Sequence, residues 1–555
     1  KIVIYLQKKL PSNNKMTKRL LLNLLLLVFS AISVNAYKVS TEPQNKNVLI
    51  EDFSGIYCGH CYEAADLIEA ISRNHPQVSA ITMHAGDWAK PGPSDKDLRC
   101  VESLEIDQYF GEKGYPSGTV NRLEYDGEIL SSRATWTEQT CIYTGEQAVV
   151  NLYATAVGDQ ATREMKVHVE GYYTGEPESS ENYLCVALIQ SDILSFQKGT
   201  EEGNNYPEQN VLRGYLSNVW GDPINAAKGG YFEKDYTYTV PEKHYPLEDA
   251  GQASDYVLKD LELVIFVLGK DHLDVLNVMT IRPDFGKLEA PFAFKLKKPQ
   301  IAVPQRYGFN FFEAQLCNKS LEEATSATFD VEVNGKTYTG TWTGSIAAQS
   351  NADIRILMPS NFQIEDNSDY HISLSTVNGK SAICNDILEG LYSAPIDITN
   401  TISWIVKTDN ALGDQLFCIR DADGNIVEEI GPLTPDTATT YKGTTTLEKG
   451  KTYCFEAYNP WGNGINNGKT GTKTKSGEFQ IMDAYGDIQV QVFKITFYGT
   501  RAFFTTSIDS AVEGIAEDSA PAQYYNLQGV QIEASSLNHG VFIEKRGTQA
   551  RLIKR

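Results

Sequence analysis

The sequence predicts a multidomain protein in which one α/β domain near the N-terminus is followed by several all-β sandwich domains. A length of 555 residues is too great for one hydrophobic core and corresponds to about three to five domains. Short runs of Val, Thr, Tyr and Phe, separated by Asn-Gly and Asp-Gly pairs, recur along the chain and are typical of strands joined by tight turns. One early segment differs, because a strand there runs into a helical repeat.

This early segment places two cysteines between the strand and the helix. Residues 47–53 are mostly apolar and β-prone, and the apolar positions from Ala64 onward recur at helical spacing. Cys58 would therefore lie at a helix N-terminus, where unpaired N–H groups and the helix dipole favour a thiolate. Cys61 is one turn further on, within reach of a disulfide. We expect a dithiol–disulfide pair in which Cys58 is the nucleophile and is alkylated before Cys61.

Two polar residues near the cysteines extend this prediction. His60 lies between the cysteines, and an imidazolium there would further stabilise the Cys58 thiolate and make the disulfide more oxidising. Asp52 lies six residues before Cys58 on an otherwise apolar strand, which predicts that its carboxyl is buried and has a raised pKa. The predicted catalytic residues are therefore Cys58, Cys61, Asp52 and His60.

The elements around the cysteines resemble the thioredoxin fold. In order they are an acidic strand, the Cys-Gly-His-Cys motif, a helix, a strand over 78–83, a helical run to Phe110, Pro116 and a hairpin at Asp126-Gly127. The motif itself is similar to that of protein disulfide isomerases. The resemblance implies an α/β thioredoxin-like domain over residues 40–138, in which Asp52 takes and returns the proton of Cys61.

The same resemblance implies a substrate-binding surface. Pro116 matches the cis-proline of thioredoxins, so that Tyr115 and Pro116 would hold the backbone of the substrate. Tyr57 stands where thioredoxins usually carry Trp, and it would pack beside the cysteines at this surface. Residues 87–113 are longer than the corresponding connection, and we expect them to cover the active site or to form part of a substrate groove. No cofactor is implied, because the cysteines carry the electrons.

Other interpretations of the cysteine pair remain open. The spacing of the neighbouring strand, helix and proline relative to the cysteines disfavours a chance occurrence of the pair. A zinc site would need about four ligands, whereas the chain has no second such pair and no His-rich partner, so no metal is predicted. A structural disulfide without redox function is the serious alternative, because thioredoxin-like modules are often reused as scaffolds.

A wider resemblance concerns an outer membrane family. Residues 48–61, 114–122, 206–213 and 275–278 resemble the Omp-twenty-eight-related outer membrane family of Bacteroidota. The likeness extends over about residues 45–290. In that family a thioredoxin-like domain is followed by a β-domain, which implies a β-sandwich of this type over residues 140–298.

The N-terminus has the pattern of a secretory signal peptide. Residues 1–36 form a pre-sequence in which Met16 is followed by basic residues, a short apolar stretch and small residues that end at Ala36. The apolar stretch is too short to span a bilayer, which disfavours a membrane anchor. We expect export by way of the periplasm to the outer membrane, the cell surface or the medium. The 71 acidic against 49 basic residues, a net charge of −22, exclude nucleic acid as an expected partner.

The second half of the chain is predicted to be β-rich. Residues 299–396 look Ig-like, with a hairpin turn at Asn334-Gly335. Residues 397–508 resemble a β-sandwich module of secreted Bacteroidota proteins. Asn463 replaces an Asp in the cation-binding loop of that module, so turn chemistry is favoured over a Ca²⁺ site.

Export also favours disulfides among the nine cysteines. Because nine is odd, at least one thiol stays outside any pairing within the chain. Cys317 with Cys384, and Cys418 with Cys454, fall within single predicted β-domains and are candidate structural bridges. The other three cysteines offer one further pair.

Two segments end the chain. Residues 509–521 are small and acidic and indicate a linker. Residues 522–555, with a strand, a glycine turn, a second strand and a basic end, resemble the C-terminal sorting domain of type IX secretion cargo. A terminal β-hairpin without a sorting role is the alternative.

These features predict an exported, surface-associated thiol–disulfide oxidoreductase. Its expected partners are protein or peptide thiols and disulfides, together with components of the cell surface. The alternative is a non-enzymatic surface or adhesion protein that uses the thioredoxin-like domain as a scaffold.

Overall fold

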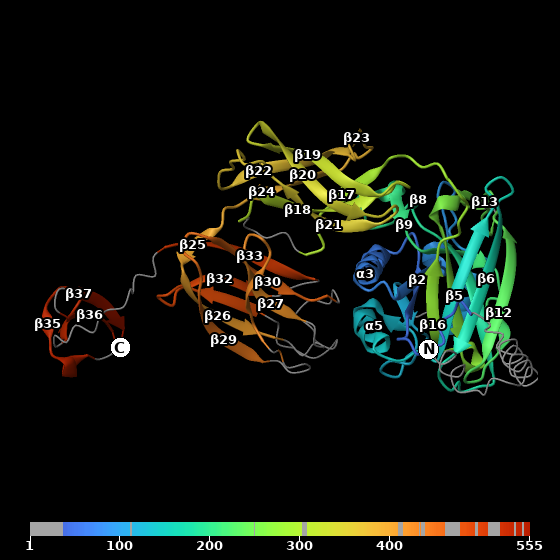
Figure 1. Ribbon diagram of the computed structural model, residues 1–555, viewed down its shortest axis with the longest axis horizontal. Helices are drawn as coiled ribbons and strands as arrows, with labels where there is room; N and C mark the ends of the chain where they lie inside the picture. Colours follow the sequence, from blue (N-terminus) through green and yellow to red (C-terminus); the bar gives the residue numbers. More distant parts are fainter. Residues whose placement is uncertain are drawn as a thin grey trace, which may run out of the picture. The chain divides into compact units, whose positions relative to one another are not determined.

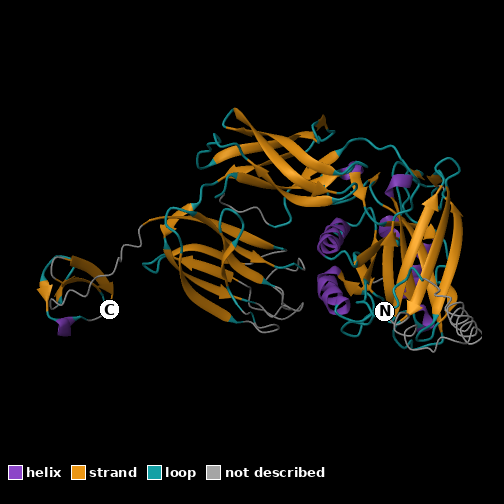
Figure 2. Cartoon of the chain, in the orientation of Figure 1, coloured by secondary structure: helices purple, strands orange, loops and turns teal. Residues whose placement is uncertain are grey.

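The computed structural model describes residues 37–111, 114–248, 250–301, 308–408, 415–431, 433, 439–460, 478–493, 498–508, 522–537, 540–546 and 549–554. The chain forms two compact units, Lys1–Glu289 and Ala290–Arg555. Strands dominate both units, and the longer helices belong to the first (Figures 1 and 2). No helix within the described ranges combines the length and the apolar character that a membrane crossing requires.

The first unit begins with an α/β segment. Its elements are β1 (Val48–Ser54), α3 (Cys61–Asn74), β2 (Val78–His84), α4 (Val101–Phe110), β3 (Ser117–Val120), β4 (Ser131–Ser132) and α5 (Trp136–Thr144). β1 pairs in parallel with β2 and antiparallel with β3, and β3 pairs antiparallel with β4. Helix α3 forms where the sequence predicts it, because Ala64, Ile68 and Ile71 fall on one buried face.

The remaining elements of the first unit are strands. They are β5 (Val150–Gly158), β6 (Glu164–Tyr173), β7 (Glu181–Gln190), β8 (Ile193–Ser195), β9 (Tyr206–Glu208), β10 (Val211–Tyr215), β11 (Asp222–Asn225), β12 (Tyr231–Thr239), β13 (Lys243–His244), β14 (Ser254–Asp255), β15 (Leu261–Leu268) and β16 (Val275–Ile281). Strands of both segments join one nine-stranded sheet in the order β16-β15-β7-β10-β2-β1-β3-β4, with β11 paired to β7. The division predicted near residue 139 therefore does not separate two sheets.

Both faces of this sheet are covered. Helices α3 and α5 pack on one face of the β1–β3 region, against Val48, Ile50 and Val120. The three-stranded sheet β12-β6-β5 packs against β7 and β15, which gives the second segment a sandwich core. Helix α4 contributes Ile106 to a core that contains apolar residues from both segments, among them Phe53 and Phe266. The shared core explains why the two segments form one unit.

A buried ion pair lies within this shared core. Arg122 donates from Nε and Nη2 to the carboxylate of Glu51 at 2.7 and 2.6 Å, and both side chains are fully buried. The guanidinium also lies 5.6 Å from the rings of Phe110 and Trp220 and 5.8 Å from that of Phe266. The pair thus connects β1 and the end of β3 to side chains of α4 and β15.

The second unit contains the predicted β-sandwiches. The strands of its first sheet are β17 (Phe294–Lys297), β18 (Phe311–Asn318), β19 (Ala324–Val333), β20 (Lys336–Ile346), β21 (Asn351–Leu357), β22 (Ser368–Val377), β23 (Lys380–Ser381) and β24 (Ile387–Tyr392). This sheet folds around one apolar core. Asn334 and Gly335, at φ 51° and 72°, form the predicted turn between β19 and β20.

A further sandwich and a small terminal sheet complete the second unit. The sandwich consists of β25 (Ile396–Thr399), β26 (Thr401–Lys407), β27 (Leu416–Arg420), β28 (Ile426–Glu429), β29 (Thr440–Thr446), β30 (Thr452–Tyr458), β31 (Glu478–Met482), β32 (Ile488–Phe493) and β33 (Gly499–Ile508). Its two sheets enclose one core. The terminal sheet consists of β34 (Gln523–Tyr525), β35 (Gln531–Ile532), β36 (Val541–Arg546) and β37 (Gln549–Lys554). The predicted signal peptide, the Asn463 loop and the linker over 509–521 lie outside the described residues.

The two candidate bridges of the second unit are not formed. Cys384, Cys418 and Cys454 are thiols. In the antiparallel register of β27 and β30, Cys454 lies opposite Arg420, two residues along from Cys418. Such diagonal positions are about 7–8 Å apart, beyond the usual Cα separation in a disulfide. Sequence spacing alone predicted a pairing that the strand register does not allow.

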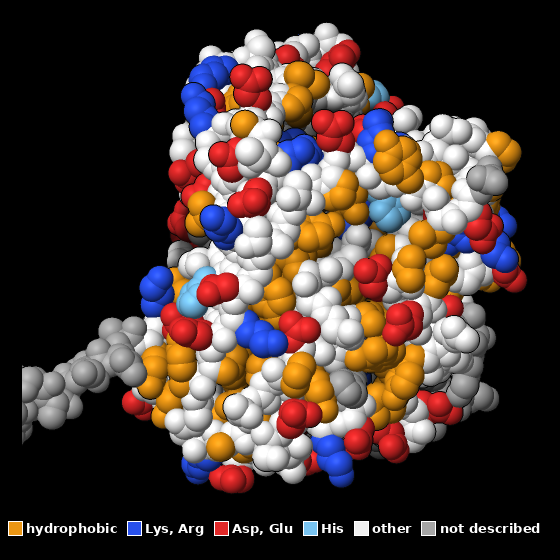
Figure 3. Space-filling model, turned by 90° about the vertical axis from the view of Figure 1, so that its right-hand side faces the viewer, with side chains coloured by type: hydrophobic (Ala, Val, Ile, Leu, Met, Phe, Trp, Pro, Cys, Tyr) orange, Lys and Arg blue, Asp and Glu red, His pale blue; other side chains and the backbone are white. Residues whose placement is uncertain are grey.

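The surface carries charges of both signs. On the face shown in Figure 3, acidic and basic side chains are interspersed with apolar ones.

The buried ion pair generates a prediction for stability. Glu51→Gln leaves the guanidinium of Arg122 without its counter-charge inside the core, and we expect it to destabilise the first unit by about 3–5 kcal/mol. Hydrogen exchange of β1 and β3 amides measures this free energy in the intact chain. Glu262→Gln is the matched control, because its ion pair with Arg282 is partly exposed and is worth about 1 kcal/mol or less. Equal protection in the two variants would contradict the prediction.

Candidate functional site

The predicted cysteine pair forms a disulfide at the N-terminal end of α3. Cys58 and Cys61 are bonded, with their Cα atoms 5.5 Å apart. Cys61 is the first residue of α3, and the Cys58 N–H donates to the carbonyl of Gly55 at 2.9 Å, which closes the turn after β1. Only 5% of Cys58 and 2% of Cys61 is exposed. The disulfide therefore lies where the turn after β1 leads into α3. Little of either cysteine is accessible to solvent.

Asp52 is buried in β1, as the sequence predicts. It lies in the β1 register between Thr82 of β2 and Gly118 of β3. Its side chain is fully buried, and neither carboxyl oxygen has a hydrogen-bond partner among the described residues. Burial, aided by the negative charge of Glu208, raises the pKa of Asp52 to about 8, against the opposing effect of Arg133. At neutral pH this carboxyl is mainly protonated.

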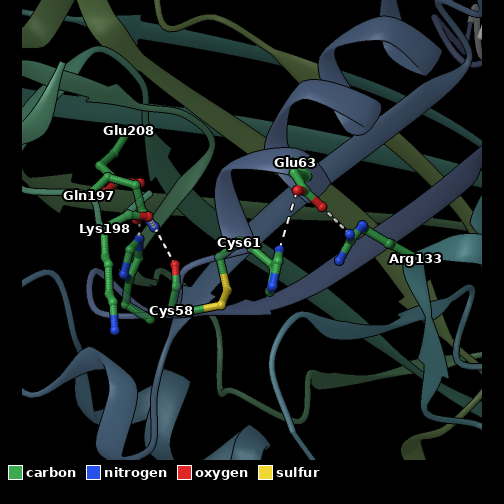
Figure 4. Close-up of a disulfide and its surroundings, with 9 residues drawn as sticks. Cys58, Cys61, Glu63, Arg133, Gln197, Lys198 and Glu208 are labelled. Carbon is green, nitrogen blue, oxygen red and sulfur yellow. Dashed lines mark hydrogen bonds and ion pairs between the residues drawn. A yellow bond between two sulfur atoms is a disulfide. The ribbon is translucent and has the colours of Figure 1, made fainter. Parts of the chain in front are cut away.

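His60 is exposed beside the disulfide. It is the N-cap residue of α3, and 72% of its side chain is accessible. Its Nδ1 lies 3.3 Å from Oε1 of Glu63, whose other oxygen accepts a hydrogen bond from Arg133. Figure 4 shows Glu63 and Arg133 on one side of the disulfide. The imidazole thus lies next to the cysteines, but it shares the Glu63 carboxylate with Arg133. Its effect on the Cys58 thiolate stays a prediction.

The predicted substrate-binding residues surround the same end of the sheet. The Tyr115–Pro116 peptide is cis, and the following residue, Ser117, pairs with Phe53 at the end of β1. The Tyr115 hydroxyl donates to Asp107 of α4 at 2.8 Å, so this side chain is held by the helix. Pro116 and its cis peptide therefore lie at the end of β1 from which the chain continues to Cys58.

Tyr57 joins the insertion to the turn before Cys58. Its hydroxyl donates to Asp95, and its N–H donates to the carbonyl of Trp88 at 2.9 Å. Gly55 is required here, because a Cβ would lie 2.6 Å from the Trp88 backbone. Residues 87–95 therefore pack against the turn, in agreement with the expectation that the insertion covers this region.

A segment that sequence reasoning missed lies on the other side of the disulfide. We call residues Ile193–Glu208, which include β8 and β9, the arm. Gln197 of the arm donates from Nε2 to the carbonyl of Cys58 at 2.8 Å, and the Lys198 N–H donates to Ile56 at 2.8 Å. Figure 4 shows Gln197, Lys198 and Glu208 on the side of Cys58 away from Glu63 and Arg133. The arm thus forms one wall of the site.

Apolar contacts and a close backbone approach hold the arm in place. Ile56, Leu98, Ile193 and Val211 form a small buried cluster against which Tyr57 and Phe196 pack. Gly199, at φ 95°, approaches the backbone so closely that a Cβ would lie 2.7 Å from the carbonyl of Gly59. No local pattern signals these contacts, although residues 206–213 carry part of the family resemblance.

The comparisons with known proteins concern the same region. Residues 104–285 match the family model described as outer membrane protein Omp28. The match begins within α4, after the disulfide, and includes Pro116 and the whole arm. It supports the predicted export to the outer membrane or cell surface, in a chain that is similar to this family over these residues. No curated protein is significantly similar to the chain in sequence.

Two solved structures are similar to parts of the chain. HBP35 of Porphyromonas gingivalis is 16% identical, with 62% of this chain and 98% of that chain covered and a TM-score of 0.33. A domain of the outer membrane lipoprotein Omp28 from Porphyromonas gingivalis is 24% identical, with 25% of this chain and 91% of that chain covered and a TM-score of 0.17.

The burial of Asp52 generates a prediction for the pH dependence of stability. The folded protein keeps the Asp52 proton up to a pH of about 8, whereas the unfolded chain loses it near the ordinary aspartate pKa of 3.8. The free energy of unfolding of the parent is therefore unaffected by this group at low pH, and it falls as the pH rises from about 4 through about 8. We therefore expect Asp52→Asn to be increasingly more stable than the parent over this range, by several kcal/mol at its upper end.

Thermal unfolding of the oxidised protein at pH 4, 6 and 8 measures the effect. Asp126→Asn is the control, because Asp126 is an exposed turn residue at φ 52°, where Asn is equally suited. A stability difference between Asp52→Asn and the parent that does not change with pH would show that Asp52 is ionised in the folded state.

Proposed function

We propose that the chain is an exported, surface-associated thiol–disulfide oxidoreductase whose reactive centre is the Cys58–Cys61 disulfide. The observation that carries this proposal is the buried carboxyl of Asp52, which lacks hydrogen-bond partners among the described residues and lies in the strand that leads to the disulfide. A buried polar group without partners costs free energy, and a purely structural disulfide would gain nothing from it. A proton exchanger for a thiol requires such a group, with a pKa near the working pH.

The arrangement of the α/β segment supports a thioredoxin-like domain. The order β1-α3-β2-α4-β3-β4-α5, the parallel β1–β2 pair and the antiparallel β1–β3 and β3–β4 pairs agree with that fold. So does the cis peptide before β3. Here the segment continues through β10 into the strands of the Omp28-related region, so the proposed domain is one part of a larger sheet.

In the proposed reaction the two cysteines have different roles. The thiolate of reduced Cys58 attacks a substrate disulfide and forms a mixed disulfide, while one substrate sulfur leaves as a thiolate. Asp52 then takes the proton of Cys61, and the Cys61 sulfur displaces the second substrate sulfur from Cys58. Tyr115 and Pro116 would hold the backbone of the substrate, a protein or peptide, with Tyr57 beside the cysteines, and His60 would stabilise the Cys58 thiolate.

One observation favours the alternative of a structural scaffold. Both cysteines are almost completely buried, and the arm is bonded to the Cys58 carbonyl. A surface or adhesion protein that uses the disulfide only for stability would have this degree of coverage. The reduction potential separates the two functions, because structural disulfides are typically below about −300 mV.

We expect the oxidised chain to equilibrate with glutathione at a potential nearer about −180 mV than about −270 mV. We also expect it to reduce insulin and to isomerise scrambled ribonuclease. Cys58→Ser should abolish both activities, and Asp52→Asn should slow release of the second substrate thiol while Cys58 alkylation stays nearly normal. A potential below about −300 mV together with absent turnover would establish the scaffold alternative.

We further propose that residues 522–555 are a sorting domain. In support, β34–β37 form a separate sheet by pairing among themselves. The resemblance to type IX secretion cargo supplies the role, and the segment between this sheet and the preceding sandwich would be the cleavage region.

Removal of residues 522–555 should therefore retain the protein in the periplasm, as measured by cell fractionation. The first unit should stay folded, because its sheet and cores contain none of the described residues of this segment. Retention of the Cys58–Cys61 disulfide is the control for folding. A truncated protein that still reaches the surface or the medium would show that residues 522–555 form a terminal sheet without a sorting role.

A further inference from the structure

Three buried ionisable side chains near the site lie on three different strands. Asp52 belongs to β1, His84 ends β2 and Glu208 ends β9 of the arm. All three side chains are buried. Among the described residues, both oxygens of Asp52, both ring nitrogens of His84 and Oε1 of Glu208 have no hydrogen-bond partner. Five polar atoms without such partners thus belong to three residues that strand pairing and the His84–Glu208 contact bring near one another, which points to a functional site.

The topology of the sheet brings Glu208 to this place. Residues after the arm pair with β2, because the Thr82 N–H donates to the carbonyl of Asn210 at 2.8 Å and Val211 pairs with Thr82. Thr82 is also the β2 partner of Asp52 in the parallel register. Glu208, two residues before Asn210, therefore enters the core beside the strand that carries His84, and its Oε2 lies 3.6 Å from His84 Nε2.

We propose that Glu208 is a positioning residue of the redox site, a second carboxylate delivered by the arm that governs when Asp52 carries the proton of Cys61. This inference rests on the proposed oxidoreductase function. Glu208 is buried, its Oε2 faces His84, and its Oε1 has no hydrogen-bond partner among the described residues. The same arm also donates a hydrogen bond from Gln197 to the Cys58 carbonyl. The arm therefore contacts the nucleophile, Cys58, and also carries the residue that acts on the base, Asp52.

The charges around the two carboxylates agree with this role. The negative charge of Glu208 and the burial of Asp52 act in the same direction on the pKa of Asp52, and Arg133 opposes them. Arg133 is itself paired with Glu63. His84 faces Glu208 as its nearest counter-group, and Tyr206, also on β9, stays neutral because burial raises the pKa of its hydroxyl. Glu208 is thus the acidic group that acts most strongly on Asp52.

The step that Glu208 influences is the resolution of the mixed disulfide. The proton of the Cys61 thiol moves to the Asp52 carboxylate. The Cys61 sulfur attacks the Cys58 sulfur, a Cys58–Cys61 bond forms, and the bond between Cys58 and the substrate breaks. The electron pair leaves on the substrate sulfur, which takes a proton from water. The site dithiol is thereby oxidised to the disulfide, and the substrate disulfide is reduced to two thiols.

The test compares the pH profile of this step in full-length variants. The rate of release of the second substrate thiol, from a mixed disulfide between Cys58 and a model peptide, is measured between pH 5 and 10. In Glu208→Gln, which keeps the shape of the side chain, the midpoint of the profile should fall by about one pH unit, and the plateau at high pH should fall because Asp52 is then a weaker base. Glu208→Asp keeps the charge and should retain most of the parent midpoint.

Two further measurements make the result decisive. Glu202→Gln removes an exposed acid from the same arm and should leave the midpoint unchanged. The titration of the Asp52 carboxyl, followed by ¹³C NMR in the oxidised protein without substrate, should show the same downward shift in Glu208→Gln. A parent without turnover overturns the proposed function. A parent that turns over, with identical midpoints in Glu208→Gln, overturns the role of Glu208 alone.

Discussion

The pairing of β10 with β2 is the constraint on which the candidate site depends. Without it, β2 would be an open edge with unpaired N–H and C=O groups, which is unfavourable in a buried sheet. The hydrogen bond from Thr82 to Asn210 begins this pairing and joins the α/β segment to the strands that follow. Because the arm directly precedes β10, the same pairing fixes the arm beside Cys58. The pairing of β10 with β2 therefore both covers the edge of β2 and assembles the site.

The parts of the fold that sequence could predict are those determined by local pattern. Strand β1, helix α3 and the Asn334-Gly335 turn follow from residue periodicity and turn chemistry within a few positions. The burial of Asp52 follows from its place on an apolar strand. These features require no knowledge of which distant strands pair.

The arm could not be predicted, because its contacts connect positions far apart in the chain. Gln197 is separated from Cys58 by 139 residues, and its side chain has no partner of fixed spacing to reveal the contact. The register of β27 and β30, which keeps Cys418 and Cys454 apart, is equally invisible in their spacing. The continuous sheet across residue 139 was missed for the same reason, since a boundary estimated from composition carries no information on strand pairing.

The arm also covers one side of the disulfide and leaves the other side more accessible. Gln197, Lys198 and Glu208 close one side of Cys58, while Glu63 and Arg133 lie on the other (Figure 4). The exposed group on that second side is His60, whose imidazole is 72% accessible and is paired with Glu63. In the proposed reaction, a substrate thiol or disulfide would therefore approach from the side of His60. Asp52 and Glu208 are buried away from water, and this burial strengthens the effect of the Glu208 charge on the Asp52 carboxyl.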